Sequence, residues 1–352
     1  MKIESVYIER DYEGMIEDLD LEFKGVYCHA AQDLKRNLYL NNPLFVCKIE
    51  GKVEGYAIIE KYSFNRGSVW FGPIVKQEMY LEIILVELIA CLKRNGIGSV
   101  YFYPLNGLIA ETLNQLVQKK SIYVIGSDSG MVTAVKKLSG LAAEHDLLQS
   151  YTSDLRRSLK KAIANEVKIR FITNLKDFEK LIVVFLNLYD SKNISINKDS
   201  AKRTLMEEFN YIKQTGNGCI LAANYQGEIV GGLIQIYTRN VGMYIHAASD
   251  KQIKIPIMHL IVHHGMMEAQ LKGLQYYDMG AIAADETKKE WKGFTFFKMS
   301  FGCEKSIYPM AVCVSNNRWN KVRFQIIEKL LGLMRILLRR KKQTREFSFD
   351  LN

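Results

Sequence analysis

The chain has 352 residues, of which 48% are hydrophobic, so it can bury a large core, and its length favours two domains. Lysine and arginine (48) outnumber aspartate and glutamate (38), and the net charge of +10 favours anionic partners such as tRNA, nucleotide-sugar phosphates or an anionic bilayer face. No window holds the ~18 uncharged apolar residues of a membrane span, and the acidic, alternating N-terminus excludes a signal or transit peptide.

The cysteines are scattered without C-x-x-C spacing, at Cys28, Cys47, Cys91, Cys219, Cys303 and Cys313. Most stand in apolar runs, so we interpret them as small buried hydrophobic residues in a reducing compartment and not as a disulfide framework. Together with the composition, this predicts a soluble cytoplasmic protein.

The first half of the chain predicts a strand at residues 2–8, a helix at 33–40, and then a clear hairpin. Its strands are Leu44 to Glu50 and Val53 to Glu60, joined at Gly51-Lys52. The elements expected after the hairpin are a strand at 68–72, helices at 76–94 and 108–120 on either side of a strand at 99–104, and strands at 122–125 and 131–135.

Residues 140–165 are polar and helical, and we place the domain boundary there. A basic cluster in this segment consists of Arg156, Arg157, Lys160 and Lys161, which is either a solvated helix face or a surface for phosphates. The expected elements beyond it are a strand at 168–173, helices at 175–191 and 199–214, a hairpin of 219–225 and 228–237, a strand at 241–248, a helix at 257–272 and a strand at 274–280.

The order of elements in the second half repeats that of the first. Gly227 lies 176 positions after Gly51, and at this offset the hairpin G-x-[VI]-x-G pattern coincides in both copies. Gly98, before SVYFY, lies 175 positions before Gly273, which precedes LQYYD. A strand–turn–strand–strand–helix–strand unit therefore occurs twice at nearly constant spacing.

A unit of this order resembles the GNAT acyltransferase fold, and two in tandem resemble the Fem family of non-ribosomal peptidyltransferases, which add amino acids to peptidoglycan precursors, with their FemAB-like relatives. The fold class expected is therefore α/β (α+β), with a mixed, mostly antiparallel sheet flanked by helices in each domain. The segments that carry the resemblance are LRRSLKKAIANEVKI, the strand from Tyr244 to Ser249, YYDMGA and GFTFFKMSFG. We expect an N-terminal domain over 1–148, a C-terminal domain over 149–312, and a basic amphipathic helix in 313–352.

The chain also departs from the family pattern. Ala281 replaces the usual second glycine of the YYDMGA segment, and Ala247 and Ala248 replace small glycines. The arginine that often follows the first helix of the second domain is missing, and Lys192 lies nearest to its place. Since that arginine would face acceptor phosphates, its absence leaves the acceptor open.

The reaction implied by the resemblance is transfer of an acyl group from an activated ester or thioester to an amine. Its tetrahedral intermediate carries an oxyanion, which requires fixed positive charge or N–H donors. The resemblance assigns this role to Lys298, near the 3′ end of an aminoacyl-tRNA, with Phe297 and Phe301 as pocket walls that lower the local dielectric. Asp278 is the candidate catalytic carboxylate: it would either act as general base or hold the following loop through backbone N–H groups.

Further substrate-binding candidates are Tyr244, His246, Ser249, Gly280, Lys192, Arg157 and Lys160. His246 is either a general base or a satisfied strand histidine. His259 and His263 have the i, i+4 spacing of zinc ligands, but no H-E-x-x-H pattern or third ligand accompanies them, so we predict no metal site.

The loops expected to hold a donor, GPIVKQEMYL and SDKQIKIPIM, contain no G-x-G, and Pro256 removes an N–H donor. This favours aminoacyl-tRNA as co-substrate, with no bound cofactor, over acyl-CoA. The primary hypothesis is an aminoacyltransferase acting on an amine of a peptidoglycan precursor or related nucleotide- or lipid-linked cell-surface saccharide. The alternatives are an acyl-CoA-dependent N-acyltransferase for an amino sugar of surface polysaccharide, and a non-catalytic membrane-associated adaptor.

The C-terminal segment has an apolar helical stripe that ends in a cluster of arginines and lysines at residues 335–342. Such a helix either lies on the inner face of an anionic membrane or folds back on the first domain. The first alternative predicts a peripheral membrane protein.

Overall fold

The computed structural model describes residues 1–23, 29, 31, 33–62, 65–119, 122–128, 131–141, 143–191, 197–284, 291–315 and 326. The chain forms two compact units. Unit 1 contains Met1–Tyr12, Asn41–Gly130 and Tyr308–Asn352, and unit 2 contains Glu13–Leu40 and Met131–Ile307. Within the described residues, no helix is both long and apolar enough to cross a bilayer.

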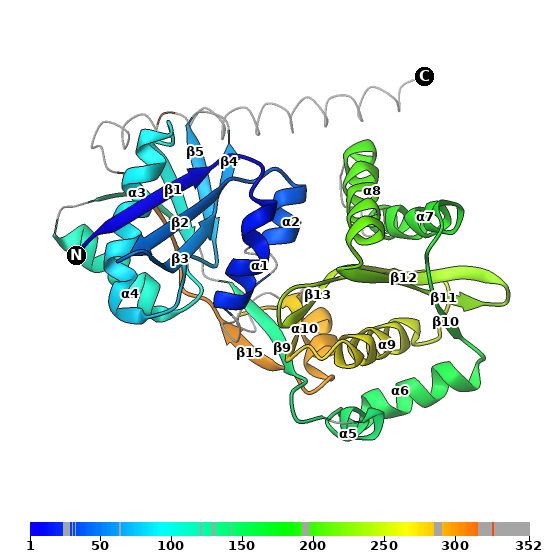
Figure 1. The fold of residues 1–352 in the computed structure, drawn as a ribbon. Helices are drawn as coiled ribbons and strands as arrows, with labels where there is room; N and C mark the ends of the chain where they lie inside the picture. Colours follow the sequence, from blue (N-terminus) through cyan, green and yellow to red (C-terminus); the bar gives the residue numbers. More distant parts are fainter. Residues whose placement is uncertain are drawn as a thin grey trace, which may run out of the picture. The chain divides into compact units, whose positions relative to one another are not determined.

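Unit 1 contains two sheets and the helices that cover them (Figure 1). The first sheet has the order β1 (Ile3–Ile8), β2 (Leu44–Ile49), β3 (Lys52–Ile58) and β6 (Ile74–Val75). The second has the order β4 (Glu60–Tyr62), β5 (Arg66–Trp70), β7 (Ser99–Tyr103), β16 (Ala311–Ser315) and β8 (Tyr123–Asp128). The helical segments are η2 (Glu78–Tyr80), α3 (Leu81–Arg94) and α4 (Gly107–Gln118).

Unit 2 is built on a single mixed sheet. Its order is β10 (Lys168–Phe171), β11 (Gly218–Tyr225), β12 (Glu228–Tyr237), β13 (Val241–Ser249), β14 (Tyr276–Ala281), β9 (Val132–Lys137) and β15 (Glu304–Ile307). The helices are α1 (Glu13–Glu22), α2 (Leu34–Tyr39), α5 (Glu144–Gln149), α6 (Ser153–Ala164), α7 (Leu175–Ser191), α8 (Lys198–Thr215), α9 (Ile257–Leu271) and α10 (Lys292–Met299).

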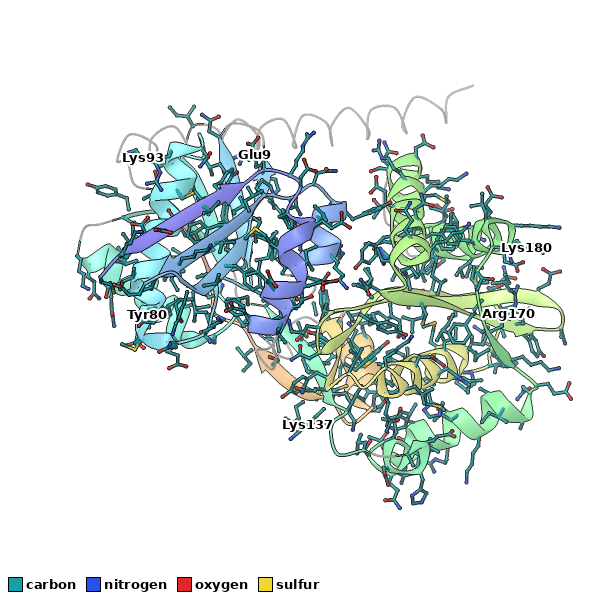
Figure 2. The ribbon with its side chains drawn as sticks, in the orientation of Figure 1. Glu9, Tyr80, Lys93, Lys137, Arg170 and Lys180 are labelled. Atoms are coloured by element: carbon teal, nitrogen blue, oxygen red, sulfur yellow. The ribbon has the colours of Figure 1, made fainter. Side chains whose placement is uncertain are left out.

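Helices cover both faces of the unit 2 sheet. Buried side chains of α6 and α9 form one core with the inner strands, and buried side chains of α7 and α8 form a second core on the other face. Figure 1 shows these two helical layers on opposite sides of β11 and β12. Charged side chains such as Lys93, Lys137 and Lys180 are exposed at the periphery of their units (Figure 2).

The predicted repeat is present in the strand pairing of the two units. In each, a hairpin is followed by a strand that pairs in parallel with the strand after the next helix: β5 with β7, and β13 with β14. The glycines Gly55 and Gly231, which share a place in the repeat, explain the shared motif. A Cβ at Gly55 would come within 2.8 Å of Ile84 in α3, and one at Gly231 within 3.1 Å of Ile257 and Ile261 in α9. Glycine therefore lets each helix pack closely against its hairpin.

The units are not consecutive along the chain, unlike the predicted division at residues 148 and 312. The strand expected at 131–135 belongs to unit 2, where β9 pairs with both β14 and β15. Conversely, β16 lies in unit 1 between β7 and β8. Residues 13–40 also cluster with unit 2. Pairing between strands that are distant in sequence sets the boundaries of the two units. No change in local composition indicates these boundaries in the sequence. Of the segment predicted as a C-terminal helix, residues 313–315 instead belong to β16 because they pair with β7 and β8. Beyond them only Ile326 lies within the described residues.

Candidate functional site

The candidate site lies where β13 and β14 separate. The two strands pair in parallel from Val241 opposite Tyr276 to Met243 opposite Asp278. Beyond that point β13 stays paired with β12, whereas β14 pairs with β9 through Ala281. Where the two strands separate, their facing backbone groups no longer pair with each other. We call this place the fork, and Tyr244, Gly280 and Ala281 lie at it.

Lys298 projects to this fork from α10. Its side chain is 2% exposed, and its Nζ donates a hydrogen bond to the Ala281 carbonyl oxygen at 3.0 Å. The ammonium also lies 4.1 Å from the ring centroid of Phe294 and 5.2 Å from that of Tyr244. A Cβ at Gly280 would be 3.7 Å from the Nζ, so the glycine keeps the backbone close to the cation.

Burial lowers the pKa of Lys298 to about 8, and the nearby negative charge of Asp278 opposes that shift. The ammonium is thus the major form at neutral pH, held in a poorly solvated place by aromatic faces and one carbonyl. Lys298 is buried and forms no ion pair with a carboxylate among the described residues. Such a cation is costly to keep, which is typical of a functional group.

Asp278 supports the fork from within the sheet. It is fully buried, its Oδ1 accepts the Gly280 N–H at 2.7 Å, and its Oδ2 accepts the Thr133 hydroxyl at 3.4 Å. Gly280 has a φ of 74°, a conformation that glycine adopts without strain. Of the two roles expected for Asp278, this geometry matches the holding of the loop, and its charge also acts on the ammonium of Lys298.

Replacing Asp278 by asparagine separates these two effects. The amide oxygen can still accept the Gly280 N–H, but the negative charge that raises the pKa of Lys298 is lost. We expect the alkaline fall of the transfer rate, which follows loss of the ammonium proton, to move to lower pH. The measurement is the pH profile of transfer by the wild type and Asp278→Asn, and an unchanged alkaline limb would contradict this coupling.

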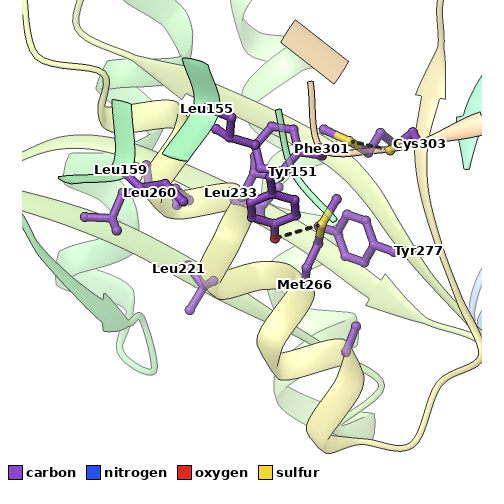
Figure 3. Packing of buried hydrophobic residues seen from close by; sticks show 14 of the residues in the cluster. Tyr151, Leu155, Leu159, Leu221, Leu233, Leu260, Met266, Tyr277, Phe301 and Cys303 are labelled. Atoms are coloured by element: carbon purple, nitrogen blue, oxygen red, sulfur yellow. Dashed lines mark hydrogen bonds between the residues drawn. The ribbon is translucent and has the colours of Figure 1, made fainter. Parts of the chain in front are cut away.

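The aromatic residues predicted as pocket walls have other surroundings. Phe301 is fully buried and packs against Tyr151 at a ring centroid distance of 5.3 Å (Figure 3). Its ring centroid also lies 5.4 Å from that of Phe297. Phe297 is half-buried, and its ring centroid lies 5.0 Å from that of His259. The rings over the cation are instead those of Phe294 and Tyr244. Phe294 was not predicted, although it stands four residues before Lys298 and thus on the same helix face.

The β13 candidates do not share one face of the sheet. Tyr244 pairs with Gln235 and His246 with Ile234, so Ile245 is an extra residue in the ladder. This bulge places Tyr244 against the core of α9 and directs His246 towards Phe185 of α7, at 6.3 Å. Ser249 borders a separate hollow of about 300 Å³ at the end of α7. The prediction groups these three residues as substrate-binding candidates because of the family resemblance of this strand.

A polar cluster missed by the sequence analysis lies on the His246 face. Arg36 of α2 contacts Glu208 of α8 at 3.3 Å, and both side chains are largely buried. Burial lowers the pKa of His246, and the charge of Glu208 opposes this. Asp33 caps α2 by accepting the Arg36 backbone N–H, and burial raises its pKa to about 6. The long sequence separation of Arg36 and Glu208 hid this cluster.

Asp33→Asn tests the cost of this buried carboxyl. The folded pKa of about 6 exceeds the ordinary 3.8, so the folded protein binds more protons between these values and its stability falls as pH rises through them. Asparagine keeps the helix cap without the charge. We expect the variant to be more stable than the wild type by on the order of 1–3 kcal/mol at pH 7.5, and by less at pH 4.5. Urea unfolding at both pH values measures this, and a variant less stable at pH 7.5 would contradict it.

The basic residues of α6 face solvent. The side chain of Arg157 is 76% exposed and forms an ion pair with Asp154, and Lys160 is also exposed. The other side of α6 is buried in the core through Leu155 and Leu159 (Figure 3). Within the described residues no hydrogen bond or ion pair joins this basic face to Lys298, so its role towards tRNA stays a prediction. Lys192 lies outside the described residues.

The paired histidines of α9 belong to the core. His263 is 4% exposed and bonds with the Tyr151 hydroxyl at 3.2 Å and with Glu144 at 3.1 Å. His259 packs against Phe297. Burial lowers the pKa of both imidazoles, which favours their neutral forms.

Residues 149–293 match the family model of the acetyltransferase (GNAT) domain. A search of curated proteins by sequence finds no match. Among solved structures, the crystal structure of FemX is similar with a TM-score of 0.71 and 11% identity, over 89% of this chain and 97% of that one.

Two further structures share the fold at lower similarity. L-PGS from Bacillus licheniformis has a TM-score of 0.55 and 14% identity, over 92% of this chain and 98% of that one. A tandem GNAT protein from the clavulanic acid biosynthesis pathway has a TM-score of 0.52 and 8% identity, over 90% and 99%. The predicted fold is therefore confirmed: residues 149–293 match the GNAT domain model, and the chain as a whole shares the fold of FemX and of a tandem GNAT protein.

Proposed function

We propose that the protein is an aminoacyltransferase that moves an amino acid from aminoacyl-tRNA to an amine of a peptidoglycan precursor or a related nucleotide- or lipid-linked cell-surface saccharide. The observation that carries this proposal is the buried ammonium of Lys298 at the fork of β13 and β14. The fold similarity to FemX and L-PGS supports it.

In this reaction the acceptor amine attacks the ester carbonyl, and the carbonyl oxygen becomes an oxyanion. Collapse of this intermediate breaks the ester C–O bond and releases the tRNA ribose hydroxyl, whose oxygen takes up a proton in place of the one that the amine loses. An ammonium has three N–H donors, and the structure shows one of those of Lys298 bonded to Ala281. The other two are available for the oxyanion once the substrate displaces Phe294, whose side chain is 40% exposed. Burial strengthens this interaction, because the local dielectric is low and the cation is already in place.

The start of α9 supports tRNA over acyl-CoA as donor. A helix that cradles a pyrophosphate presents its first N–H groups to the ligand. Here the Ile257 N–H bonds to the Ile255 carbonyl, the His259 N–H bonds to the Pro256 carbonyl, and Pro256 has no N–H. These donors are already used inside the loop.

A donor competition assay tests the proposal. Purified protein would receive either tRNA charged with radiolabelled amino acids or radiolabelled acetyl-CoA, with sugar-nucleotide and lipid-linked precursor fractions as acceptors. We expect label to pass from aminoacyl-tRNA to an acceptor amine. Label that passes from acetyl-CoA alone would overturn the tRNA donor and favour the acyl-CoA alternative, which the match to the acetyltransferase domain and the tandem GNAT neighbour support.

A further inference from the structure

Unit 2 contains a second hollow, of about 430 Å³, that the transfer reaction does not use. It lies at the end of the sheet where β11 begins and β12 ends, between the C-terminal ends of α8 and α9. No residue of the Lys298 fork lines it. Its apolar wall consists of Phe171, Ile172, Phe209, Ile212 and Ile220.

The wall is open to water on one side. Phe171 is 47% exposed, whereas Phe209 and Ile220 are 3% and 2% exposed. A hollow of this size with a buried apolar wall and an exposed aromatic lip falls in the range of small-molecule sites. An apolar group bound there would cover the Phe171 ring and release ordered water from the wall.

The floor of the hollow has polar atoms that bond to one another. Cys219 Sγ accepts hydrogen bonds from the Tyr237 hydroxyl and Gln235 Nε2, both at 3.2 Å, and the same amide donates to the Tyr237 oxygen at 2.9 Å. Gln235 is fully buried: its Oε1 accepts the Tyr277 hydroxyl, and its two N–H groups are shared among Cys219, Tyr237 and the Gly265 carbonyl. Because these groups satisfy one another, the floor accepts an apolar ligand without loss of hydrogen bonds.

Charge at the rim favours an anion. Lys213 and Lys272 line the opening together with a single carboxylate, Glu268. Lys213 Nζ stands 6.0 Å from the Phe209 ring centroid, at the edge of the apolar wall. Two flexible ammonium groups above an apolar wall suit a ligand with an anionic head and an apolar body.

From these observations we propose that this hollow binds a single-chain amphiphile with an anionic head, such as a medium-chain carboxylate or phosphate ester. The chain lies on the Phe209 and Ile212 wall, and the head contacts Lys213 and Lys272. This site is independent of the proposed transfer reaction, and its test needs no turnover.

The test is equilibrium dialysis of the full chain against radiolabelled decanoate, with decyltrimethylammonium as a cation of matched chain length. We expect saturable binding of one decanoate, at least about fivefold weaker binding by the Lys213→Gln/Lys272→Gln variant, and little competition from the cation. Ile212→Arg should abolish binding by filling the wall. Ile163→Arg, at an exposed isoleucine of α6, is the matched control and should bind as the wild type does.

Protection of Cys219 from iodoacetamide gives a second readout. Cys219 is half-buried, whereas Cys47, Cys91, Cys303 and Cys313 are buried, so peptide mapping can follow its labelling at pH 9. Decanoate should slow this labelling in the wild type and in Ile163→Arg but not in Ile212→Arg. No saturable binding, equal binding by Ile212→Arg, or equal competition by the cation would each overturn the proposal.

Discussion

Replacing Lys298 by methionine is expected to reduce transfer by about 100- to 1,000-fold, the usual cost of removing one group that stabilises an oxyanion. Methionine has a similar length and no charge, so it fits the apolar space between Phe294 and Tyr244. We therefore expect the variant to fold and to be at least as stable as the wild type at pH 7. The measurements are the initial rate of label transfer and the urea unfolding curve.

The pH dependence of stability provides an independent check on this variant. The folded pKa of Lys298, about 8, lies below its ordinary 10.5, so the unfolded chain binds more protons between these values. The Lys298 contribution to stability therefore rises with pH from about 8 to 10.5 and should be missing from Lys298→Met. Lys292→Met, at an exposed position of the same helix, is the control and should retain activity. Full activity of Lys298→Met would contradict the catalytic role.

Gly302→Ala is expected to lower the free energy of unfolding by about 2–4 kcal/mol. Gly302 has a φ of 68°, and a Cβ built there would overlap the Ser150 carbonyl oxygen and lie 2.9 Å from the Nζ of Lys136. Lys136 donates a hydrogen bond to the Gly302 carbonyl at 3.2 Å, so the substitution disturbs a buried contact as well as the backbone. Urea unfolding measures the loss.

Gly293→Ala is the matched control for this substitution. Gly293 lies near the start of α10 with nothing within 4 Å of its Cβ direction, and alanine favours the helix there. We expect a change within about 1 kcal/mol, in the stabilising direction. Equal free energies of unfolding for Gly302→Ala and Gly293→Ala would contradict the close packing of Gly302 against Ser150.

Local turn chemistry made much of the fold predictable. Gln226 and Gly227 both have positive φ, as two-residue hairpin turns require, and glycine makes this turn visible in sequence. In the first copy the turn is Glu50 and Gly51, one residue earlier than predicted, because Lys52 already belongs to β3. The recurrence of these hairpins also gave the tandem arrangement, since both copies need a glycine beneath their helices.

Long-range pairing set the limit of prediction. The exchange of β9 and β16 depends on partners more than 140 residues away, as Asp278 opposite Val135 illustrates. The extra residue Ile245 reverses the face of His246 relative to Tyr244, and neither residue type signals a bulge. For the candidate site, the sequence predicted Lys298 and Asp278, whereas Phe294 required knowledge that α10 is helical around the lysine.

The central claim, that the 3′ end of a tRNA reaches the buried amine of Lys298, can be measured by covalent trapping. A tRNA with its 3′-terminal ribose oxidised to a dialdehyde forms an imine with a nearby lysine, and cyanoborohydride reduction fixes the bond for peptide mass mapping. Burial lowers the pKa of Lys298 to about 8, which increases its reactive neutral fraction above that of surface lysines. We predict a link at Lys298 that Lys298→Met abolishes. Links confined to exposed lysines such as Lys160, formed equally by both proteins, would contradict the account.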